Sequence, residues 1–367
     1  MRINAVISYL EQLYPKHLAY DWDPVGLQVG NVSDEVQGIL VTLDVTEAVV
    51  REAIDKKLNF IVSHHPFIFK PLANLNTQTP KGRVISLAMK HDICIYSMHT
   101  NYDIAPKGMN DVLADLLGLE QTKPLVVTHS EAYVKLIVYV PTDHVEAIKE
   151  ALGVANAGQL GNYAYCSFSS TGTGSFKPLE GSHPSIGTTG KLEQVEEVKV
   201  EAIVKSSEVD SVIKAVKLVH PYEVMAYDVF KQEIKFEETT YGLGRVGQLK
   251  EPMQMASYIQ HVKSQLNVAH ARFIGDRDKV VKRVAVVGGS GAGQAGAAKR
   301  AKADLYISGD IGFHDGGDAL DMGLNILDVG HHAECVMKQH VTTLLREFAP
   351  DVMVEASVIS TDPFQFV

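Results

Sequence analysis

Residues 59–66 read Asn-Phe-Ile-Val-Ser-His-His-Pro, and the rest of the chain is organised around them. The apolar half of this stretch predicts a buried strand, and the polar half places His64 and His65 at its carboxyl end, before a proline. Open α/β sheets place their binding sites at the carboxyl ends of their strands. Neutral imidazole is the side chain that most often binds metal ions. We therefore expect a metal site where this strand ends.

Three later apolar runs end in the same way, with histidine or carboxylate residues close behind a predicted strand. Because ligand sites of α/β sheets gather at the carboxyl ends of the strands, the four runs together predict one polar cluster. The runs and the polar residues that follow them are 93–98 with His99, Thr100 and Asp103, then 304–308 with Asp310 and His314, and finally 324–329 with His331 and Glu334.

Composition narrows the class of protein. The chain has 367 residues, which favours two domains over one. Its 34 Lys+Arg against 44 Asp+Glu give a net charge of −10, so binding to a nucleic-acid backbone is not indicated. The three cysteines are widely spaced and odd in number, which provides no disulfide framework or thiolate zinc site and fits a reducing cytosol. We expect a cytoplasmic protein.

The amino-terminal residues indicate a helix that packs on the protein rather than a targeting signal. Apolar residues recur with helical spacing over 3–14, which is typical of an amphipathic helix that packs on the body of the protein. A basic segment followed by a long apolar core, as in a signal peptide, is absent there. No run approaches the ~18 consecutive apolar residues of a membrane span, so no membrane partner is expected.

The alternation of elements predicts two domains, one inserted in the other. Over 1–126 and 238–367, strands alternate with helices, which indicates an α/β domain with largely parallel sheets. Residues 127–237 show strand, helix and strand patterns around a tract rich in Gly and Ser at 167–190, which is typical of a ferredoxin-like α+β domain. Residues 21–30, which include a proline and two glycines, are expected to form a loop.

The strongest constellation combines histidines with carboxylates, the ligands of zinc, iron or manganese. Side chains of adjacent residues in a strand point apart, so the histidine pair suits two ions better than one. A carboxylate is expected to bridge the two ions, and two ions ~3.5–4 Å apart hold a hydroxide between them as nucleophile. We expect two divalent ions per subunit, zinc before iron or manganese. The predicted ligands are His64, His65, Asp103, His331 and Glu334. The last two share one face at the start of a predicted helix over 332–348.

Other polar residues near these strand ends have two interpretations each. Asp310 and His314 are the predicted catalytic residues, as proton carriers or as groups that orient a ligand, although Asp310 also suits a turn. His99 is expected to line the pocket. Trp22 forms either an aromatic wall of that pocket or a packed residue in a surface turn.

A glycine-rich stretch offers a competing hypothesis. Residues 291–296, Gly-Ala-Gly-Gln-Ala-Gly, follow a predicted strand and match the dinucleotide-binding pattern, with Asp310 near the position expected of a ribose-binding acid. The same glycines instead suit a turn that brings a helix N-terminus to the pocket, where its amides hold a phosphate. The strand before them is not the first of its domain, which argues against the dinucleotide interpretation.

Five motifs together give the chain a resemblance to the Nif-three-like dinuclear-metal family, whose members are known as GTP cyclohydrolase type 2 homologues. The resemblance covers the whole chain and implies the metal ligands named above. It also implies ring-shaped homohexamers with the metal sites facing the interior, and an insert similar to PII and CutA trimer modules. The motifs are Trp22-Asp23 with Gly26-Leu27-Gln28-Val29-Gly30, Ser63-His64-His65-Pro66, His99-Thr100-Asn101-x-Asp103, Gly288-Gly289-Ser290-Gly291 and Gly330-His331-x-x-Glu334.

Two functions are compatible with these patterns. The first is a metal-dependent hydrolase that opens the guanine ring of a nucleotide at C8 or cleaves a phosphoester. The second is a metal-binding ring without catalysis, in which the insert senses a small molecule or recruits a partner. The cyclohydrolase activity is implied by the resemblance, whereas the ligand set follows from the residues themselves.

Overall fold

The computed structural model describes residues 1–231 and 240–365, and these form two compact units, Met1–His129 with Tyr241–Val367, and Ser130–Thr240. The predicted boundary at 237/238 lies outside the described residues. The first unit, called the main unit below, contains α1 (Ile3–Leu13), η1 (Lys16–Leu18), β1 (Gly26–Val29), β2 (Gly38–Thr42), α2 (Glu47–Asp55), β3 (Phe60–Ser63), α3 (Pro80–Lys90), β4 (Cys94–Ser97), α4 (Thr100–Ile104), α5 (Met109–Leu116), β5 (Leu119–Ser130), β10 (Thr240–Gln254), α8 (Met255–Gln265), β11 (Arg272–Ile274), β12 (Val280–Ser290), η3 (Ala292–Gln294), α9 (Ala295–Arg300), β13 (Leu305–Gly309), α10 (Phe313–Asp321), β14 (Asn325–Asp328), η4 (His331–Val336), α11 (Met337–Phe348) and β15 (Met353–Ala356).

The main unit is built on two sheets with parallel centres. The first has the order β1-β4-β3-β2-β15, and its inner pairs are parallel, whereas β1 pairs with β4 antiparallel. The second has the order β11-β14-β13-β12-β10-β5, in which β12, β13 and β14 are parallel and β10 and β11 add antiparallel pairs. The expectation of parallel sheets therefore holds for the strands that deliver the polar residues, and the flanking strands β1, β10 and β11 depart from it.

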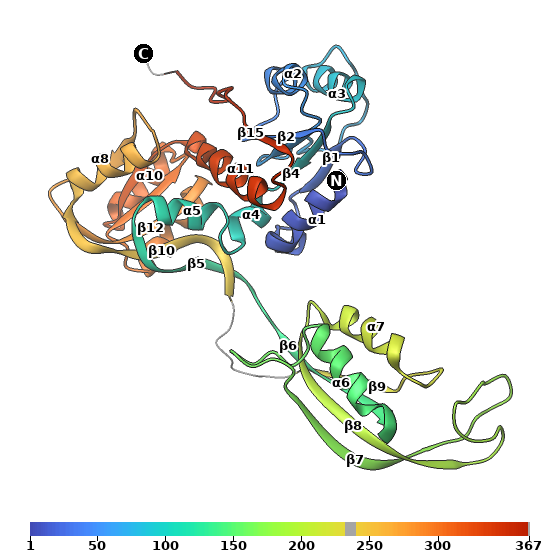
Figure 1. Ribbon diagram of the computed structural model, residues 1–367. Helices are drawn as coiled ribbons and strands as arrows, with labels where there is room; N and C mark the ends of the chain where they lie inside the picture. Colours follow the sequence, from blue (N-terminus) through green and yellow to red (C-terminus); the bar gives the residue numbers. More distant parts are fainter. Residues whose placement is uncertain (232–239, 366–367) are drawn as a thin grey trace. The chain divides into compact units, whose positions relative to one another are not determined.

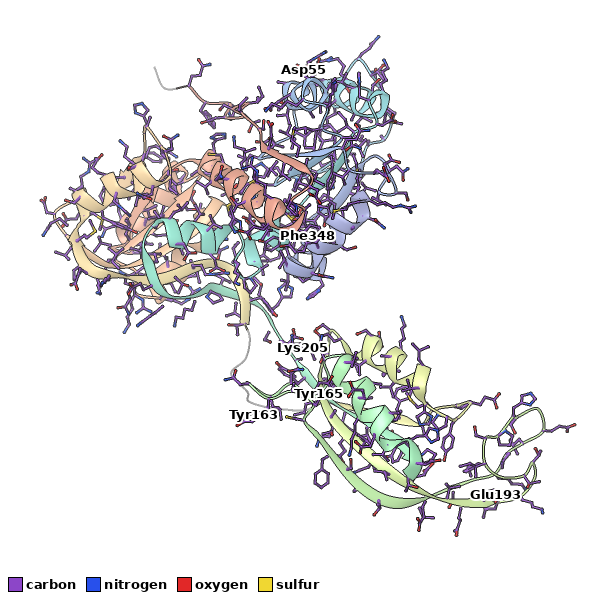
Figure 2. All side chains as sticks on the ribbon, viewed as in Figure 1. Asp55, Tyr163, Tyr165, Glu193, Lys205 and Phe348 are labelled. Carbon is purple, nitrogen blue, oxygen red and sulfur yellow. The ribbon has the colours of Figure 1, made fainter. Side chains whose placement is uncertain are left out.

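Alternating residues of the strands separate the unit into layers. In β2, Ile39 and Val41 join a core that also contains residues of the second sheet, whereas Leu40 faces the opposite way. Helices α1, α5, α8 and α11 contribute to the core between the sheets, while α2 and α3 cover the outer face of the first sheet (Figure 1). Phe348, at the end of α11, stacks on Tyr9 with ring centroids 3.9 Å apart (Figure 2).

The second unit, called the insert below, is an antiparallel sheet with two helices on one face (Figure 1). Its chain order β-α-β-β-α-β and its sheet order β7-β8-β6-β9 are those of a ferredoxin-like domain. The helices share a core with the strands that is separate from the cores of the main unit. Its elements are β6 (Tyr133–Pro141), η2 (Thr142–His144), α6 (Val145–Val154), β7 (Ser167–Phe176), β8 (Glu193–Lys205), α7 (Val209–Val219) and β9 (Tyr227–Lys231).

Several local expectations need correction. The predicted loop over 21–30 contains strand β1. The chain passes close to β4 here, and this requires glycine at position 30, because a Cβ on Gly30 would lie 2.6 Å from the Cα of Cys94. The tract 167–190 contains strand β7. This strand lies at the edge of the insert's sheet, where its glycines are tolerated. The predicted helix over 332–348 begins instead as the 3₁₀ helix η4 and becomes α-helical only in α11.

Candidate metal centre

The predicted strand ends meet at one place. Strands β2, β3 and β4 are parallel neighbours, and so are β13 and β14, so that each group presents its carboxyl ends along one edge. His64 follows β3 directly, and Asp103 lies in the short helix α4 that follows β4. From the second sheet, His331 and Glu334 lie in η4, which follows β14. Side chains from opposite ends of the chain therefore converge.

One half of the cluster is fully buried. The Nε2 atom of His64 lies 3.6 Å from Oδ1 of Asp103 and 3.6 Å from Oε1 of Glu334. His64 has no exposed surface, and the two carboxylates are also buried. One nitrogen and two oxygens thus surround a single point, which is a suitable ligand set for a borderline divalent ion.

The other half of the cluster lies closer to the surface. The Nε2 atoms of His65 and His331 are 3.3 Å apart, and each lies within hydrogen-bond distance of Oε2 of Glu334, at 3.2 and 3.3 Å respectively. Glu334 therefore offers one oxygen to each half. The 3₁₀ geometry of η4 explains the spacing of the last two residues, because side chains three apart are eclipsed in such a helix.

Each histidine is oriented by a hydrogen bond on its other ring nitrogen. The Nδ1–H group of a metal-binding histidine is usually held by a carboxylate or a carbonyl, which directs Nε2 toward the ion. In this protein the partners of Nδ1 are the backbone oxygen of Met98 for His64 at 2.8 Å, Oδ1 of Asp44 for His65 at 2.7 Å, and Oδ2 of Asp310 for His331 at 2.7 Å.

Two of the residues behind this arrangement were not predicted from the sequence. Asp44 lies two residues beyond the end of β2, and its second oxygen accepts a hydrogen bond of 2.6 Å from the hydroxyl of Thr361. From the sequence alone, the apolar run over 38–45 indicates one continuous strand, and this pattern hides Asp44 as a strand-end carboxylate. Thr361 belongs to the carboxyl-terminal segment and has no local signal that connects it to the site.

The donor set fits a cation. Among the described residues, Nε2 of His64 and Oδ1 of Asp103 are buried without a hydrogen-bond partner. Such an atom costs ~1–3 kcal/mol when nothing compensates for its lost hydration. Because the ligand atoms of His64, Asp103 and Glu334 all lie within 4.8 Å of one another, a divalent ion at this point would satisfy both atoms together. The residues present therefore fit a divalent metal ion.

Burial and mutual charge shift the titration of these groups. Burial raises the pKa of Asp103 to about 8, and the negative charge of Glu334 adds to this effect. Burial acts in the same direction on Glu334, but His64, His331 and His65 outweigh it and hold its pKa well below the usual value. For His65, burial lowers the pKa, yet hydrogen bonds to Asp44 and Glu334 prevail and raise it to about 10. A positive charge is strongly favoured beside Glu334.

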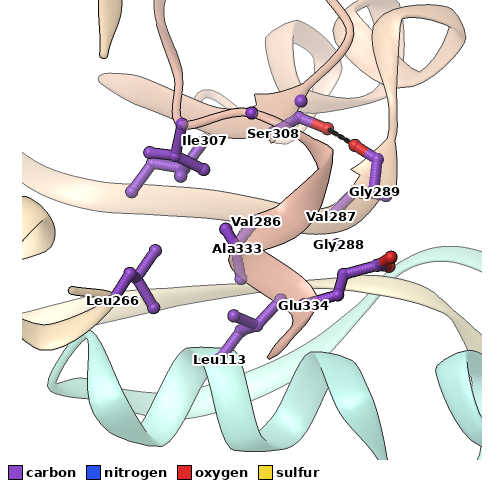
Figure 3. Close-up of a pocket in the computed structure, with 13 residues that line it drawn as sticks. Leu113, Leu266, Val286, Val287, Gly288, Gly289, Ile307, Ser308, Ala333 and Glu334 are labelled. Atoms are coloured by element: carbon purple, nitrogen blue, oxygen red, sulfur yellow. Dashed lines mark hydrogen bonds between the residues drawn. The ribbon is translucent and has the colours of Figure 1, made fainter. Parts of the chain in front are cut away.

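The Gly288-Gly289-Ser290-Gly291 motif makes room for this carboxylate. A Cβ on Gly288 or Gly289 would lie 2.9 or 2.8 Å from Oε1 of Glu334, and Gly289 has a φ of +60°. Figure 3 shows Glu334 beside these glycines at the edge of a small apolar cavity. Asn110 accepts a hydrogen bond from the amide of Gly288 at 3.0 Å. Close approach to the site explains these glycines directly.

The dinucleotide hypothesis receives no support from this geometry. The helix that follows the glycine run, α9, begins only at Ala295 and has six residues. The acid that the hypothesis assigned to a ribose, Asp310, is held by the ring of His331 instead.

The two residues predicted as catalytic lie in different surroundings. Asp310 has a φ of +56°, a strained conformation for a residue other than glycine, and its carboxylate accepts from His331. His314 is exposed in the first turn of α10, and its ring packs beside Phe313. The structure therefore assigns an orienting contact to Asp310, while the placement of His314 gives no support to a role in proton transfer.

His99 lies beside the cluster, as expected. Its Nδ1 atom is 3.0 Å from Oδ1 of Asp23, and its ring packs edge-on against His64 and His65 with centroids 5.2 and 5.6 Å away. The ligand atoms of the three histidines lie within 4.8 Å of one another. Asp23 is itself fixed by the backbone amide of Thr100 at 2.9 Å.

The chain is similar to known proteins over nearly its whole length. Residues 1–363 match the profile of the Duf34/NIF3 (NGG1p interacting factor 3) family. A Bacillus subtilis protein named "GTP cyclohydrolase 1 type 2 homolog" is 44% identical over 366 residues, which are 99% of this chain and 98% of that protein.

Solved structures agree with this similarity. A Bacillus cereus protein related to NIF3 is 45% identical and superposes with a TM-score of 0.90, covering 100% of this chain and 99% of its own. A Staphylococcus aureus protein is 34% identical with a TM-score of 0.79 and the same coverage. Within the part of the chain that the structure describes, no helix is long and apolar enough to cross a bilayer.

Proposed function

The chain belongs to the Duf34/NIF3 family, and on that premise we propose that it is a metal-dependent hydrolase that binds two divalent ions and acts on a nucleotide. Zinc is the preferred ion, with iron and manganese as alternatives, because three imidazole nitrogens and two carboxylates suit all three. The observation that carries the proposal is the position of Glu334, whose two oxygens face different groups of ligands.

The division of ligands follows from the distances. His64, Asp103 and Glu334 would hold one ion, and His65, His331 and Glu334 would hold the other. Two such ions would lower the pKa of water, supply a nucleophile at neutral pH and neutralise charge on the phosphate of an anionic substrate.

The chain's own residues position this chemistry. Asp44 and Asp310 hold the two histidines nearer the surface in the orientation that aims Nε2 at the ion. Because Asp44 is also bound to Thr361, the carboxyl-terminal segment supports the same ring. The buried half of the site excludes water around His64, which strengthens electrostatic interactions there.

Incubation with GTP tests the reaction. The protein, purified without an affinity tag and loaded with zinc, iron or manganese, is expected to convert GTP to formate and a pterin precursor through attack of water at C8. A phosphoester such as GMP is tested in parallel for release of phosphate. Turnover that disappears in His65→Ala and persists in His91→Ala would support the proposal. His91 is an exposed histidine at the end of α3. Turnover that is equal in His65→Ala and the unaltered protein, or none with either compound, removes the hydrolase function.

We also propose that the protein works in the cytoplasm as a ring-shaped homohexamer. Support for the compartment comes from the three cysteines, which are free in the structure. Light scattering coupled to gel filtration tests the assembly, with a mass six times that of one chain as the expected result. A monomer or dimer would contradict it.

For the insert, we propose a PII/CutA-like module that senses a small molecule or recruits a partner. Its own core and its antiparallel sheet support a separate role. If metal binding is found without any turnover, this module becomes the site of function, and the main unit becomes a metal-binding scaffold.

A further inference from the structure

A row of aromatic rings leads from the surface of the main unit to the metal centre. It starts at Trp22, the only tryptophan of the chain, which is 59% exposed. The neighbouring Phe69 is 45% exposed. Large aromatic side chains are usually buried against other apolar groups. Two exposed aromatic rings side by side next to a polar site therefore indicate a binding surface.

The rings follow one another at contact distance. Trp22 stacks on Tyr20 with centroids 5.7 Å apart and an angle of 17° between the rings. It meets Phe69 at 5.9 Å with a tilt of 57°, and His99 edge-on at 6.1 Å. His99 in turn packs against His64. Only one ring therefore separates the tryptophan from a ligand of the proposed ions.

The backbone on both sides of Trp22 is fixed to the same helix that supplies Asp103. The amide of Tyr20 donates to the hydroxyl of Thr100 at 3.1 Å, and the carboxylate of Asp23 accepts from the amide and the hydroxyl of Thr100. The segment that carries the indole is thus held in place before any ligand arrives, which reduces the entropy cost of binding.

We propose that Trp22, with Tyr20 and Phe69, is a stacking platform for the purine base of a nucleotide whose phosphate or reacting bond lies at the metal centre. This inference rests on the proposed function, because it deepens the substrate class of the same site. Flat heteroaromatic rings stack on aromatic side chains, and the corner between Trp22 and Phe69 presents such surfaces. The excess positive charge of the loaded centre recruits the phosphate of the same ligand.

The position of the chain's only tryptophan makes the platform directly measurable. Titration of the metal-loaded, full-length protein with GMP is expected to quench the fluorescence of Trp22 to saturation. Ribose 5-phosphate, which has the phosphate but no base, is expected to leave the fluorescence unchanged. Saturating quenching by ribose 5-phosphate as strong as that by GMP would overturn the stacking role.

Calorimetry with variants provides the second measurement. Trp22→Ala is expected to weaken GMP binding about ten- to hundredfold, and Trp22→Phe to retain part of the affinity, with the metal content unchanged in both. Tyr163→Ala removes an exposed aromatic ring from the insert and is the matched control, expected to bind GMP normally. Equal GMP affinity in Trp22→Ala and the unaltered protein would overturn the proposal.

Two further outcomes separate this inference from its premise. If GMP quenches the tryptophan but no turnover is found, the platform stands and the catalytic function fails. If the fluorescence changes with protein concentration and not with GMP, Trp22 lies between copies of the chain, and the platform is refuted.

Discussion

Oε2 of Glu334 lies 3.2 Å from Nε2 of His65, although 269 positions separate the two residues in the sequence. The other oxygen of the same carboxylate lies 3.6 Å from Nε2 of His64. The adjacent histidines that follow β3 thus lie beside opposite oxygens of one carboxylate. The arrangement divides the cluster into two halves and makes Glu334 their common member.

Glu334→Gln is expected to lose both ions. An amide offers one neutral oxygen and one NH₂ group, so one half of the cluster faces a donor and the other loses its negative charge. Elemental analysis of the purified variant is expected to give much less than one ion per chain. Glu347→Gln, an exposed carboxylate on α11, is the matched control and is expected to keep the normal content. Normal content in Glu334→Gln would refute the sharing of this residue.

The two halves are expected to be lost separately. His331→Ala removes a ligand from the half near the surface and is expected to leave about one ion per chain, held by His64, Asp103 and Glu334. Asp103→Asn is expected to show the converse, with the ion at His65 retained. Elemental analysis combined with calorimetric titration of the missing ion distinguishes the two variants. Loss of both ions in each variant would show that the halves are not independent.

Thr361→Val is expected to weaken the ion at His65 about tenfold without contact with that ion. The valine cannot donate to Asp44, so the carboxylate that orients His65 becomes free to rotate. The affinity of the second ion, measured by competition with a chelating dye, reports the change, while the first ion stays bound as before. Thr343→Val on α11 is the control. An unchanged affinity would remove Thr361 from the support of the site.

Binding of ions is expected to release about three protons per chain near pH 7. Burial lowers the pKa of His65, but hydrogen bonds to Asp44 and Glu334 raise it to about 10, and the hydrogen bond to Glu334 raises that of His331 to about 9. Both rings, together with Asp103 and its pKa of about 8, are therefore protonated in the ion-free protein at pH 7 and lose their protons once they bind an ion. Affinity consequently rises with pH until the rings lose their protons.

Titration calorimetry in two buffers of different ionisation enthalpy measures this release. The difference between the two apparent enthalpies gives the number of protons per ion. A value near zero would contradict the charge state derived for the pair.

Residue type and strand position were sufficient to predict that these side chains gather at one place. His64 and His65 follow an apolar run directly, and Asp103 and His331 each lie a few residues behind another apolar run. Parallel strands of one sheet have their carboxyl ends along the same edge, so residues that follow different strands in the sequence lie close together in space. The spacing of His331 and Glu334 survived an incorrect helix type, since a 3₁₀ turn also aligns residues three apart.

The supporting residues depended on tertiary contacts that no local pattern records. Asp44 was assigned to a strand that in fact ends at Thr42, and Thr361 reaches it from 317 positions away. Asp310 was predicted near the site, but its role became visible only through its contact with His331 and its positive φ. Trp22 had two interpretations, and its exposure and its contact with His99 place it at the surface beside the candidate metal centre.

Anomalous X-ray scattering at the absorption edge of the bound metal, with crystals of protein purified without an affinity tag, locates each ion. Two peaks per chain are expected, one among His64, Asp103 and Glu334 and one among His65, His331 and Glu334. A single peak, or peaks at other residues, would contradict a dinuclear centre that shares Glu334.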